Sequence, residues 1–478
     1  MSKIRATKPI AEPLEMYAQA FDDLFSRVSQ RQGFRDYLIG LLLADERNKT
    51  LTGLMNTEPV VGAQEARAQR LQWFLSESNW DASAINERRV KLLMETAELA
   101  PRDNGVLVID ETGDRKAGHK TAHVGRQYMA NLGKIDNGVV SVTSLWADEG
   151  IYYPLAVEPY TPAAWFEGGK KHPQFRTKLK IAVELVSQAK QRPIPFRAVV
   201  ADSFYGEDRG FRSGLEKLKV GYVLALKQSY SWWHPADQLG SLQEIALATA
   251  WSATAADMDW LAVKRTFRDG HTELWWALEV TTGPFGPKHE LRAIVVSTDP
   301  AHLPPLTTWY LITNLPAPGS SDARADWLFS ADIAEVVRLY SLRSWVEQNY
   351  KQMKHALGWA EYQVRSDLAI RRHWALVFCA FSFCWWHLDN YDLPLPPLLS
   401  DNSAQPVSDP ATPLNNELVS HRILCWPLAL RRVRAWLQPF ILLQRFWQAF
   451  SVDPLPLLLR HFVDSLARGN GIDLYSSA

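Results

Sequence analysis

Two aspartates each end a short apolar run, and a carboxylate in that position could hold a metal ion. Asp110 ends VLVID (Val106–Asp110), and Asp202 ends RAVVAD (Arg197–Asp202). If both runs are buried strands, their final carboxylates project at the rim of an open α/β sheet, where such sheets place their ligands. Each aspartate alone could equally cap a turn or a helix, so a functional interpretation depends on a third acid.

That third acid lies on a polar stripe of a predicted helix. In YSLRSWVEQNYKQMK, the spacing of Tyr340, Arg343, Glu347 and Lys354 places all four side chains along one helical face. A phenol, two cations and a carboxylate are unsuited to a core face. A surface pair between Arg343 and Glu347, worth only about 0.2–0.5 kcal/mol, is the simpler alternative. That pair does not account for Tyr340 or Lys354.

These residues carry a resemblance to a known family. The stripe matches letter for letter the Y-(2)-R-(3)-E-(6)-K signature of bacterial insertion-sequence transposases with a DDE site. VIDETGDRKAG and VVADSFYG resemble the first and second acid motifs of that family, and GRQYMANLGKIDNGVVSV resembles the segment after the first acid. The resemblance covers roughly residues 100–370. It implies a ribonuclease H-like core with the catalytic residues Asp110, Asp202 and Glu347.

The implied activity is DNA transposition: cleavage of a mobile element at its terminal inverted repeats and joining to target DNA. Three carboxylates suit this chemistry because two Mg²⁺ ions roughly 3.5–4 Å apart can activate the nucleophile and stabilise the leaving oxygen. We expect Asp110 to bridge both ions, Asp202 to hold one and Glu347 the other, with Mn²⁺ able to substitute. By resemblance, Tyr340, Arg343 and Lys354 bind the transposon end.

Three nearby acids are weaker candidates for metal ligands. Glu111 follows Asp110 and points to the opposite face if the strand continues. Asp208 fits a helix cap before Phe211, and Asp114 has no pattern of its own that favours a ligand role.

Other residues are candidates for DNA contacts. His119–Lys134 is a basic segment predicted as a loop, and Arg126, Gln127 and Tyr128 could contact double-stranded DNA. A plain surface loop is an equal alternative. The tryptophan pairs Trp232–Trp233 and Trp275–Trp276 could stack on an extruded base, although core packing is the favoured interpretation.

The order of predicted elements indicates an α/β fold. Three strands, a helix, a strand, a helix and a fifth strand predict a mixed sheet with flanking helices. The predicted elements are Val106–Asp110, Val139–Trp146, Tyr152–Val157, Lys178–Lys190, Arg197–Asp202, Phe211–Lys217 and Tyr222–Lys227. Four segments in which apolar and polar residues alternate then predict an inserted antiparallel β domain. A single helix is expected from Ala331 to about Leu357.

These patterns predict five regions. The expected regions are a helical DNA-binding domain (1–100), the first part of the core (101–227), the inserted β domain (228–330), the second part of the core with the catalytic Glu (331–390), and a loop with a helical region for DNA binding or dimerisation (391–478).

Composition restricts the class of protein. Lys plus Arg and Asp plus Glu both number 52, so gross charge does not hold the chain to nucleic acid, whereas local basic grooves still can. Three cysteines form no paired set, and we expect buried free thiols. The N-terminus lacks the apolar core of a signal peptide, and the longest apolar run, Trp374–Trp386, is too short to span a membrane.

We therefore expect a bacterial, cytoplasmic, nucleoid-associated protein without membrane contact. A homodimer is expected because two transposon ends must be brought together. Two alternatives stay open: a domesticated or inactive relative that only binds DNA, and a nuclease that does not join strands.

Overall fold

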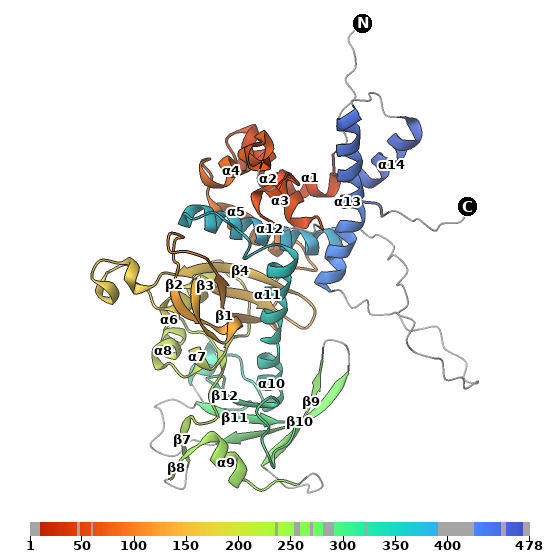
Figure 1. Ribbon diagram of the computed structural model, residues 1–478. Coiled ribbons are helices and arrows are strands. Elements are labelled where there is room, and N and C mark those ends of the chain that lie inside the picture. Colours follow the sequence, from red (N-terminus) through yellow and green to blue (C-terminus); the bar gives the residue numbers. More distant parts are fainter. Residues whose placement is uncertain are drawn as a thin grey trace, which may run out of the picture. The chain divides into compact units, whose positions relative to one another are not determined.

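The computed structural model describes residues 10–44, 48–58, 61–234, 238–252, 259–267, 271–280, 291–320, 323–390, 425–450 and 456–471 (Figure 1). The chain divides into two compact units. The first comprises Met1–Arg89, Ala356–Glu361 and Ala375–Ala478, and the second comprises Val90–His355 and Tyr362–Trp374.

The second unit is built on a mixed sheet. Strands β1 (Val106–Arg115), β3 (Lys134–Ala147) and β4 (Tyr152–Tyr160) form an antiparallel meander. Strand β5 (Ala198–Ala201) then pairs in parallel with β1, and β6 (Tyr222–Ala225) pairs in parallel with β5. The resulting order β4-β3-β1-β5-β6 is that of a ribonuclease H-like core, and the predicted fold class is confirmed.

Helices connect the parallel strands of this sheet. Helix α6 (Lys178–Gln191) lies between β4 and β5, and the short α7 (Ser203–Gly206) with α8 (Arg209–Lys217) lies between β5 and β6. Thr177 caps α6 by accepting from the amide of Lys180 at 3.1 Å, a typical N-cap contact. The apolar residues of β1 and β5 are fully buried, as expected for strands covered on both faces.

The four predicted segments of alternating apolar and polar residues form strands that continue this sheet and do not form a separate one. Strand β12 (Thr308–Thr313) pairs antiparallel with β6 and is followed across the sheet by β11 (Arg292–Ser297), β10 (Thr272–Val280) and β9 (Trp260–Thr266). The antiparallel strands are inserted between β6 and helix α10 (Ile333–Ser341) as predicted, but they extend the core sheet, because β12 covers the backbone groups that β6 would otherwise expose at an edge. Strands β7 (Ser231–His234) and β8 (Gln238–Ser241) form a small hairpin before α9 (Leu242–Ala248).

Two local predictions are corrected. Strand β1 does not end at Asp110 but continues to Arg115, because β3 pairs with it along its whole length. The segment predicted as a loop contains β2 (Gly125–Met129), which pairs with the start of β3. At Gly138, β3 pairs with β1 on one side and β2 on the other.

The expected single helix of residues 331–357 is also two helices. Helix α10 (Ile333–Ser341) and helix α11 (Ser344–Ala356) are separated by a turn at Leu342 and Arg343. The hydroxyl of Ser344 donates to the carbonyl of Ser341 at 2.9 Å, and the amide of Arg343 donates to the carbonyl of Tyr340 at 3.0 Å. Such local bonds compete with the regular helical pattern and explain the break.

The first unit is helical in its described part. Its helices are α1 (Glu12–Gln19), α2 (Val28–Leu42), α3 (Leu51–Leu54), α4 (Ala66–Ser76), α13 (Trp426–Phe450) and α14 (Leu457–Ala467), with parts of α5 (Ala82–Glu95) and α12 (Asp367–Asn390). Short 3-10 helices in the chain are η1 (Asp22–Leu24), η2 (Gly62–Gln64), η3 (Ala130–Leu132), η4 (Ala163–Trp165), η5 (Gly169–Lys171) and η6 (Ala323–Asp326).

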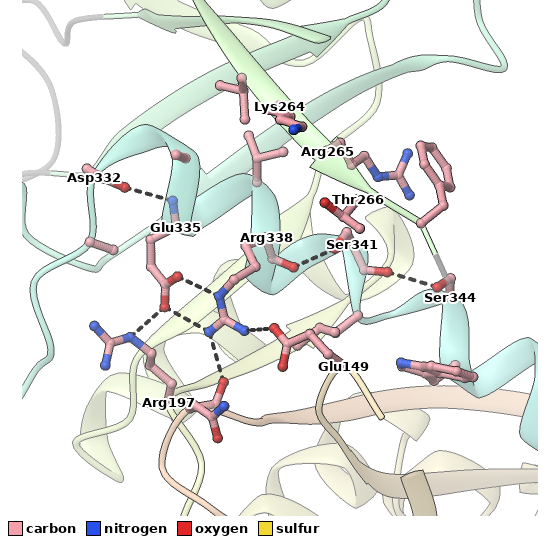
Figure 2. A pocket seen from close by; sticks show the side chains of 18 of the residues that line it. Glu149, Arg197, Lys264, Arg265, Thr266, Asp332, Glu335, Arg338, Ser341 and Ser344 are labelled. Carbon is pink, nitrogen blue, oxygen red and sulfur yellow. Dashed lines mark hydrogen bonds and ion pairs between the residues drawn. The ribbon is translucent and has the colours of Figure 1, made fainter. Parts of the chain in front are cut away.

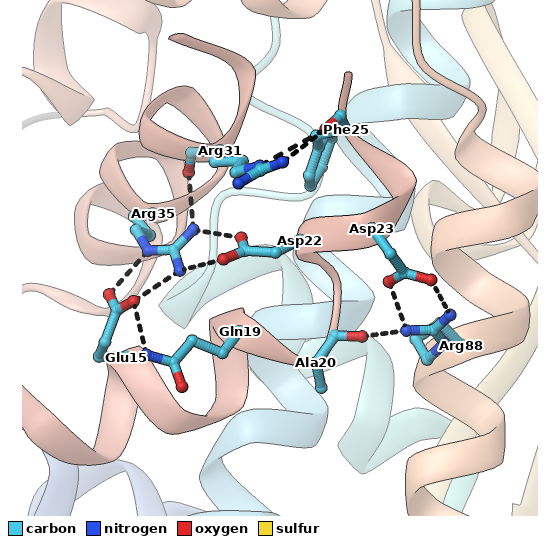
Figure 3. Close-up of polar contacts among 9 residues, drawn as sticks. All are labelled: Glu15, Gln19, Ala20, Asp22, Asp23, Phe25, Arg31, Arg35 and Arg88. Carbon is cyan, nitrogen blue, oxygen red and sulfur yellow. Dashed lines mark hydrogen bonds and ion pairs between the residues drawn. The ribbon is translucent and has the colours of Figure 1, made fainter. Parts of the chain in front are cut away.

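N-terminal and C-terminal helices share one core in this unit. The Tyr17 ring lies 5.3 Å from Phe383 and 5.5 Å from Trp386, and its hydroxyl donates to the carbonyl of Cys379 at 3.2 Å. Arg35 ties α2 to the preceding segment through Glu15 at 2.6 Å and Asp22 at 2.8 Å (Figure 3). The two ends of the chain, expected as separate regions, therefore form one unit.

Other composition-based expectations can be compared with the structure. The three cysteines are free thiols as predicted, with Cys379 and Cys384 buried and Cys425 half-buried. The predicted exposed loop at residues 393–413 lies outside the described residues. Within the described parts of the chain, none of the helices has the length and apolar character needed to cross a membrane.

Candidate active site

Arg343 brings the three predicted acids to one place. Its Nη2 atom lies 3.5 Å from Oδ2 of Asp110 and 3.9 Å from Oδ2 of Asp202, and its Nη1 atom lies 3.9 Å from Oε1 of Glu347. The sequence predicted Arg343 on one helical stripe with Tyr340, Glu347 and Lys354. The structure adds both aspartates as its neighbours.

Sheet topology explains why the two aspartates meet. The parallel pairing of β1 with β5 ends at Val108 opposite Val200, so Asp110 lies just beyond it. Asp202 directly follows β5, and its Oδ1 accepts from the amide of Phe204 at 3.1 Å, which caps α7. Asp202 therefore has the structural role considered as an alternative, and its Oδ2 still faces Arg343.

The three carboxylates differ in exposure. The exposed fraction of the side chain is 12% for Asp110, 38% for Asp202 and 72% for Glu347. The cluster thus runs from the interior at Asp110 to the solvent at Glu347, so a large substrate has access to its outer side.

Burial raises the pKa of Asp110 to about 7, an effect that Arg343 opposes and Asp202 reinforces. For Arg343, burial works against the charged form, but Asp110, Tyr340, Asp202 and Glu347 together raise its pKa. Carboxylates so close together oppose one another's ionisation. The three carboxylates therefore favour additional positive charge besides that of the Arg343 guanidinium.

This donor set is compatible with divalent cations. All three side chains offer hard carboxylate oxygens, the ligands that Mg²⁺ prefers, and Mg²⁺ retains part of its water shell, so few protein ligands suffice. In the described part of the chain, no three acidic, histidine or cysteine side chains lie close enough together to hold one ion. The carboxylates surround the guanidinium of Arg343, which stands where positive charge is favoured.

Tyr340 belongs to a ring cluster that sequence analysis missed. Burial raises its pKa to about 12, with Arg343 opposing the shift. The Tyr340 ring meets Trp309 of β12 edge-on at 5.1 Å, and the guanidinium of Arg265 lies 4.5 Å from the Trp309 ring. The alternating pattern predicted a strand at Trp309, but nothing in it indicated a contact with α10.

Lys354 is placed differently from the expectation. Its Nζ lies 2.9 Å from Oδ1 of Asp114 and donates to the carbonyl of Gly113 at 2.8 Å, and only 16% of its side chain and 1% of that of Asp114 are exposed. Helix α11 thus presents Lys354 to β1. The geometry favours a buried structural pair over a solvent-facing DNA contact.

A second cation lies close to this pair. Burial lowers the pKa of Lys116 to about 8, and Asp114 opposes that shift while Lys354 adds to it. Asp114, a weak candidate for a metal ligand in the sequence, therefore interacts with two lysines.

Glu111 and Asp208, the other weak candidates, also have partners. Glu111 pairs with Lys178 at 2.7 Å, and Asp208 accepts from the amide of Phe211 at 2.6 Å as the cap of α8. A further contact near Asp110 was not predicted: the hydroxyls of Tyr350 and Thr143 are hydrogen-bonded, which anchors α11 to β3. Thr143 is the residue opposite Asp110 in the ladder.

The predicted DNA-contact residues of β2 divide by their orientation. Arg126 and Tyr128 are exposed, whereas Gln127 is half-buried and its amide donates to the carbonyl of Gly138 at 2.8 Å. Gln127 therefore holds the hairpin together.

The tryptophan pairs are mostly packed. Trp232 and Trp275 are buried, and Trp276 is half-buried against Trp251 at 5.6 Å. The side chain of Trp233 lies outside the described residues. The favoured expectation of core packing agrees with these positions.

Comparisons with known proteins identify similar sequences and structures. A family model described as DDE superfamily endonuclease matches residues 20–243, a range that includes Asp110 and Asp202 but not Glu347. The chain is 33% identical over 367 residues to the probable transposase for insertion sequence element IS701 of Microchaete diplosiphon, covering 76% of this chain and 85% of that protein. The cryo-EM structure of a piggyBac transposase synaptic complex with hairpin DNA aligns over 99% of this chain and 85% of that chain, with 10% identity and a TM-score of 0.41.

Proposed function

The chain belongs to the transposases of the DDE endonuclease superfamily, and we propose that it cuts a mobile DNA element at its terminal inverted repeats and joins it to target DNA. The observation that carries this proposal is the convergence of Asp110, Asp202 and Glu347 on Arg343. The three acids come from distant parts of the chain, and the outermost, Glu347, is exposed to solvent.

In this proposal the three carboxylates are the catalytic residues and hold two Mg²⁺ ions, for which Mn²⁺ can substitute. Ions bound there would supply activation of a water or 3′-hydroxyl and stabilisation of the leaving oxygen. Asp110, the most buried of the three, is held in place by the β1–β3 ladder. Glu347 approaches from α11, which the Tyr350–Thr143 hydrogen bond anchors beside Asp110.

Arg343 neutralises part of the acidic charge and can also donate to a DNA phosphate, because a guanidinium presents five N–H donors. Tyr340 positions the turn that carries Arg343 through its contact with Trp309. Exposed Arg126 and Tyr128 are proposed to contact DNA further from the cut. Lys354, which resemblance assigns to the transposon end, supports the site through its pair with Asp114.

We further propose that the protein acts as a homodimer, because two transposon ends must be cut and joined in one complex. The dimer would place one set of these carboxylates on each end.

The test uses the full chain with DNA that carries the element's own ends and flanks. We expect strand cleavage at the ends with Mg²⁺ or Mn²⁺ and joined product when target DNA is added. Cleavage should stop with a chelator. Binding without any cleavage would contradict the proposal in favour of a DNA-binding protein only, and cleavage without joined product would contradict it in favour of a nuclease.

A further inference from the structure

A second region of the same unit has the features of a binding site. A cleft of about 1260 Å³ lies between the edge strand β9 and helix α10 (Figure 2). Its lining includes Ser341, Ser344 and Trp345, the residues on either side of the turn that carries Arg343. The cleft lining therefore includes sequence neighbours of Arg343 but none of the residues of the candidate active site.

One wall of the cleft is balanced in charge. Arg338 on α10 pairs with Glu335 at 2.6 Å and with Glu149, and Arg197 pairs with the same Glu335 at 2.7 Å (Figure 2). Asp332 accepts from the amide of Glu335 at 2.7 Å as the cap of α10. The acids that line the cleft are therefore already engaged by cations or by a helix end.

The opposite wall includes two cations on β9, Lys264 and Arg265. The side chains of Lys264 and Arg265 form neither a hydrogen bond nor an ion pair with any residue in the described ranges. Glu273 is the residue opposite Arg265 in the β9–β10 ladder and interacts with it electrostatically. Its carboxylate accepts from Nε1 of Trp275 at 2.8 Å and pairs with His271 at 3.4 Å.

Aromatic rings surround the guanidinium of Arg265, and Glu273 attracts it electrostatically without forming an ion pair or a hydrogen bond with it. The guanidinium lies 4.1 Å from the centroid of Phe267, 4.6 Å from Trp275 and 4.5 Å from Trp309. Rings fix a guanidinium by its plane and leave its N–H groups to point elsewhere. An arginine fixed in this way loses less freedom when it binds a planar or tetrahedral anion.

The geometry points to this cleft as a second DNA contact, in which Arg265 anchors a backbone phosphate of a DNA strand and Lys264, which also lines the cleft, contributes a second positive charge. Arginine suits this role because its parallel N–H groups match two phosphate oxygens. The volume exceeds the roughly 300–1,000 Å³ of small-molecule sites and favours a segment of a polymer. This inference rests on the proposed function, which makes DNA the substrate.

The alternative is that Arg265 only packs among the rings. The two roles differ in a measurable way, because a phosphate contact releases a counterion and a packing contact does not.

The experiment measures DNA binding by fluorescence anisotropy without metal, so that cleavage is not involved. The probes are a labelled single strand and a labelled duplex of about 20 nucleotides, longer than one typical binding site, titrated between about 50 and 200 mM salt. The variants are Lys264→Gln, Arg265→Gln and Arg265→Lys. The matched control is Lys217→Gln, which removes an exposed lysine of α8.

We expect each Gln variant to reduce the slope of log affinity against log salt by about 0.7 for the single strand or about 0.9 for the duplex. Arg265→Lys should keep the slope but bind more weakly, because lysine keeps the charge and loses the planar contact. Arg265→Gln could also destabilise the ring cluster, and for that reason the exposed Lys264 provides an independent measurement.

If both Gln variants show the same salt slope as Lys217→Gln, the cleft inference is overturned and the proposed function still stands. A wild-type chain that binds neither probe would contradict both.

Discussion

The Nη2 atom of Arg343 lies 3.5 Å from the Oδ2 atom of Asp110. This contact joins a residue in a turn between two helices to a residue in the middle of the central strand of the core. Because Asp110 is buried and close to Asp202, its negative charge would otherwise be opposed by burial and by a like charge. Arg343 and a bound cation are therefore two ways of neutralising the same cluster, and this relation can be tested.

The three carboxylates should be required for cleavage but not for binding. We expect Asp110→Asn, Asp202→Asn and Glu347→Gln each to lower the cleavage rate at least about a hundredfold, the scale of losing one aligned charge interaction in a transition state. Affinity for a transposon end should change little, because phosphate contacts come from cations. Gel assays of cleavage and binding on the same DNA measure both quantities.

Glu95→Gln is the matched control, because Glu95 is also an exposed helical glutamate. It should cleave at the wild-type rate. Full activity in any of the three site variants would remove that residue from the proposed catalytic set.

Arg343→Gln should make the protein more dependent on divalent cations for stability. Loss of the guanidinium leaves three acids without their shared cation, so the melting temperature without metal should fall. Mg²⁺ should then raise it more than in the wild type, by about 2–4 °C for each kcal/mol recovered. Differential scanning fluorimetry with and without Mg²⁺ provides the measurement.

Arg102→Gln, at an exposed arginine paired with Glu98, should respond to Mg²⁺ as the wild type does. An identical Mg²⁺ response in Arg343→Gln and wild type would mean that cations do not act at the cluster around Arg343.

Lys354→Met should reduce the free energy of unfolding by roughly 3–5 kcal/mol, the usual effect of removing one partner from a buried ion pair. The reason is that Asp114, which is 1% exposed, would lose the cation 2.9 Å away. Combining Lys354→Met with Asp114→Asn should recover part of the loss, since the buried charge is then absent too. Urea unfolding of the wild type, both single variants and the double variant measures the coupling.

A Lys354→Met protein with wild-type stability and a reduced salt slope for DNA binding would reverse this assignment. Lys354 would then act at the transposon end, as the family resemblance implies.

The sequence predicted the core sheet because its strands are unbroken apolar runs. Val106–Ile109 and Ala198–Ala201 are buried on both faces, and such runs are recognisable without knowledge of their partners. The extension of β1 from Glu111 to Arg115 was missed for the opposite reason. Those residues are mostly polar or glycine, and only pairing with β3 makes them a strand.

Helical spacing placed Arg343, Glu347 and Lys354 on one stripe, but spacing does not determine what each residue faces. Glu347 lies at the exposed end of the acid cluster, while Lys354 faces the buried Asp114. The contact between Tyr340 and Trp309 depends on how α10 packs against β12. Such contacts between distant segments follow from the tertiary fold and have no local pattern.

His387 should make the stability of the helical unit depend on pH. Burial lowers the pKa of His387 to about 4, and Arg432 adds to this shift. Its Nε2 accepts from Nε1 of Trp436 at 3.0 Å, which requires that nitrogen to be unprotonated. The unfolded chain, with a histidine pKa near 6.5, binds more protons between pH 6.5 and 4. The contribution of neutral His387 to the free energy of unfolding is therefore complete above pH 6.5 and is lost as the pH falls towards 4.

Between pH 6.5 and pH 4, the free energy of unfolding should fall by roughly 3 kcal/mol through His387. His387→Gln removes the titrating group while its amide oxygen can still accept from Trp436. Urea unfolding from pH 7 to pH 4 should therefore show a shallower decline in the variant than in the wild type. His461 of α14, which is exposed, provides the control: His461→Gln should follow the wild-type curve. Parallel curves for His387→Gln and wild type would show that protonation of His387 does not limit the stability of this unit.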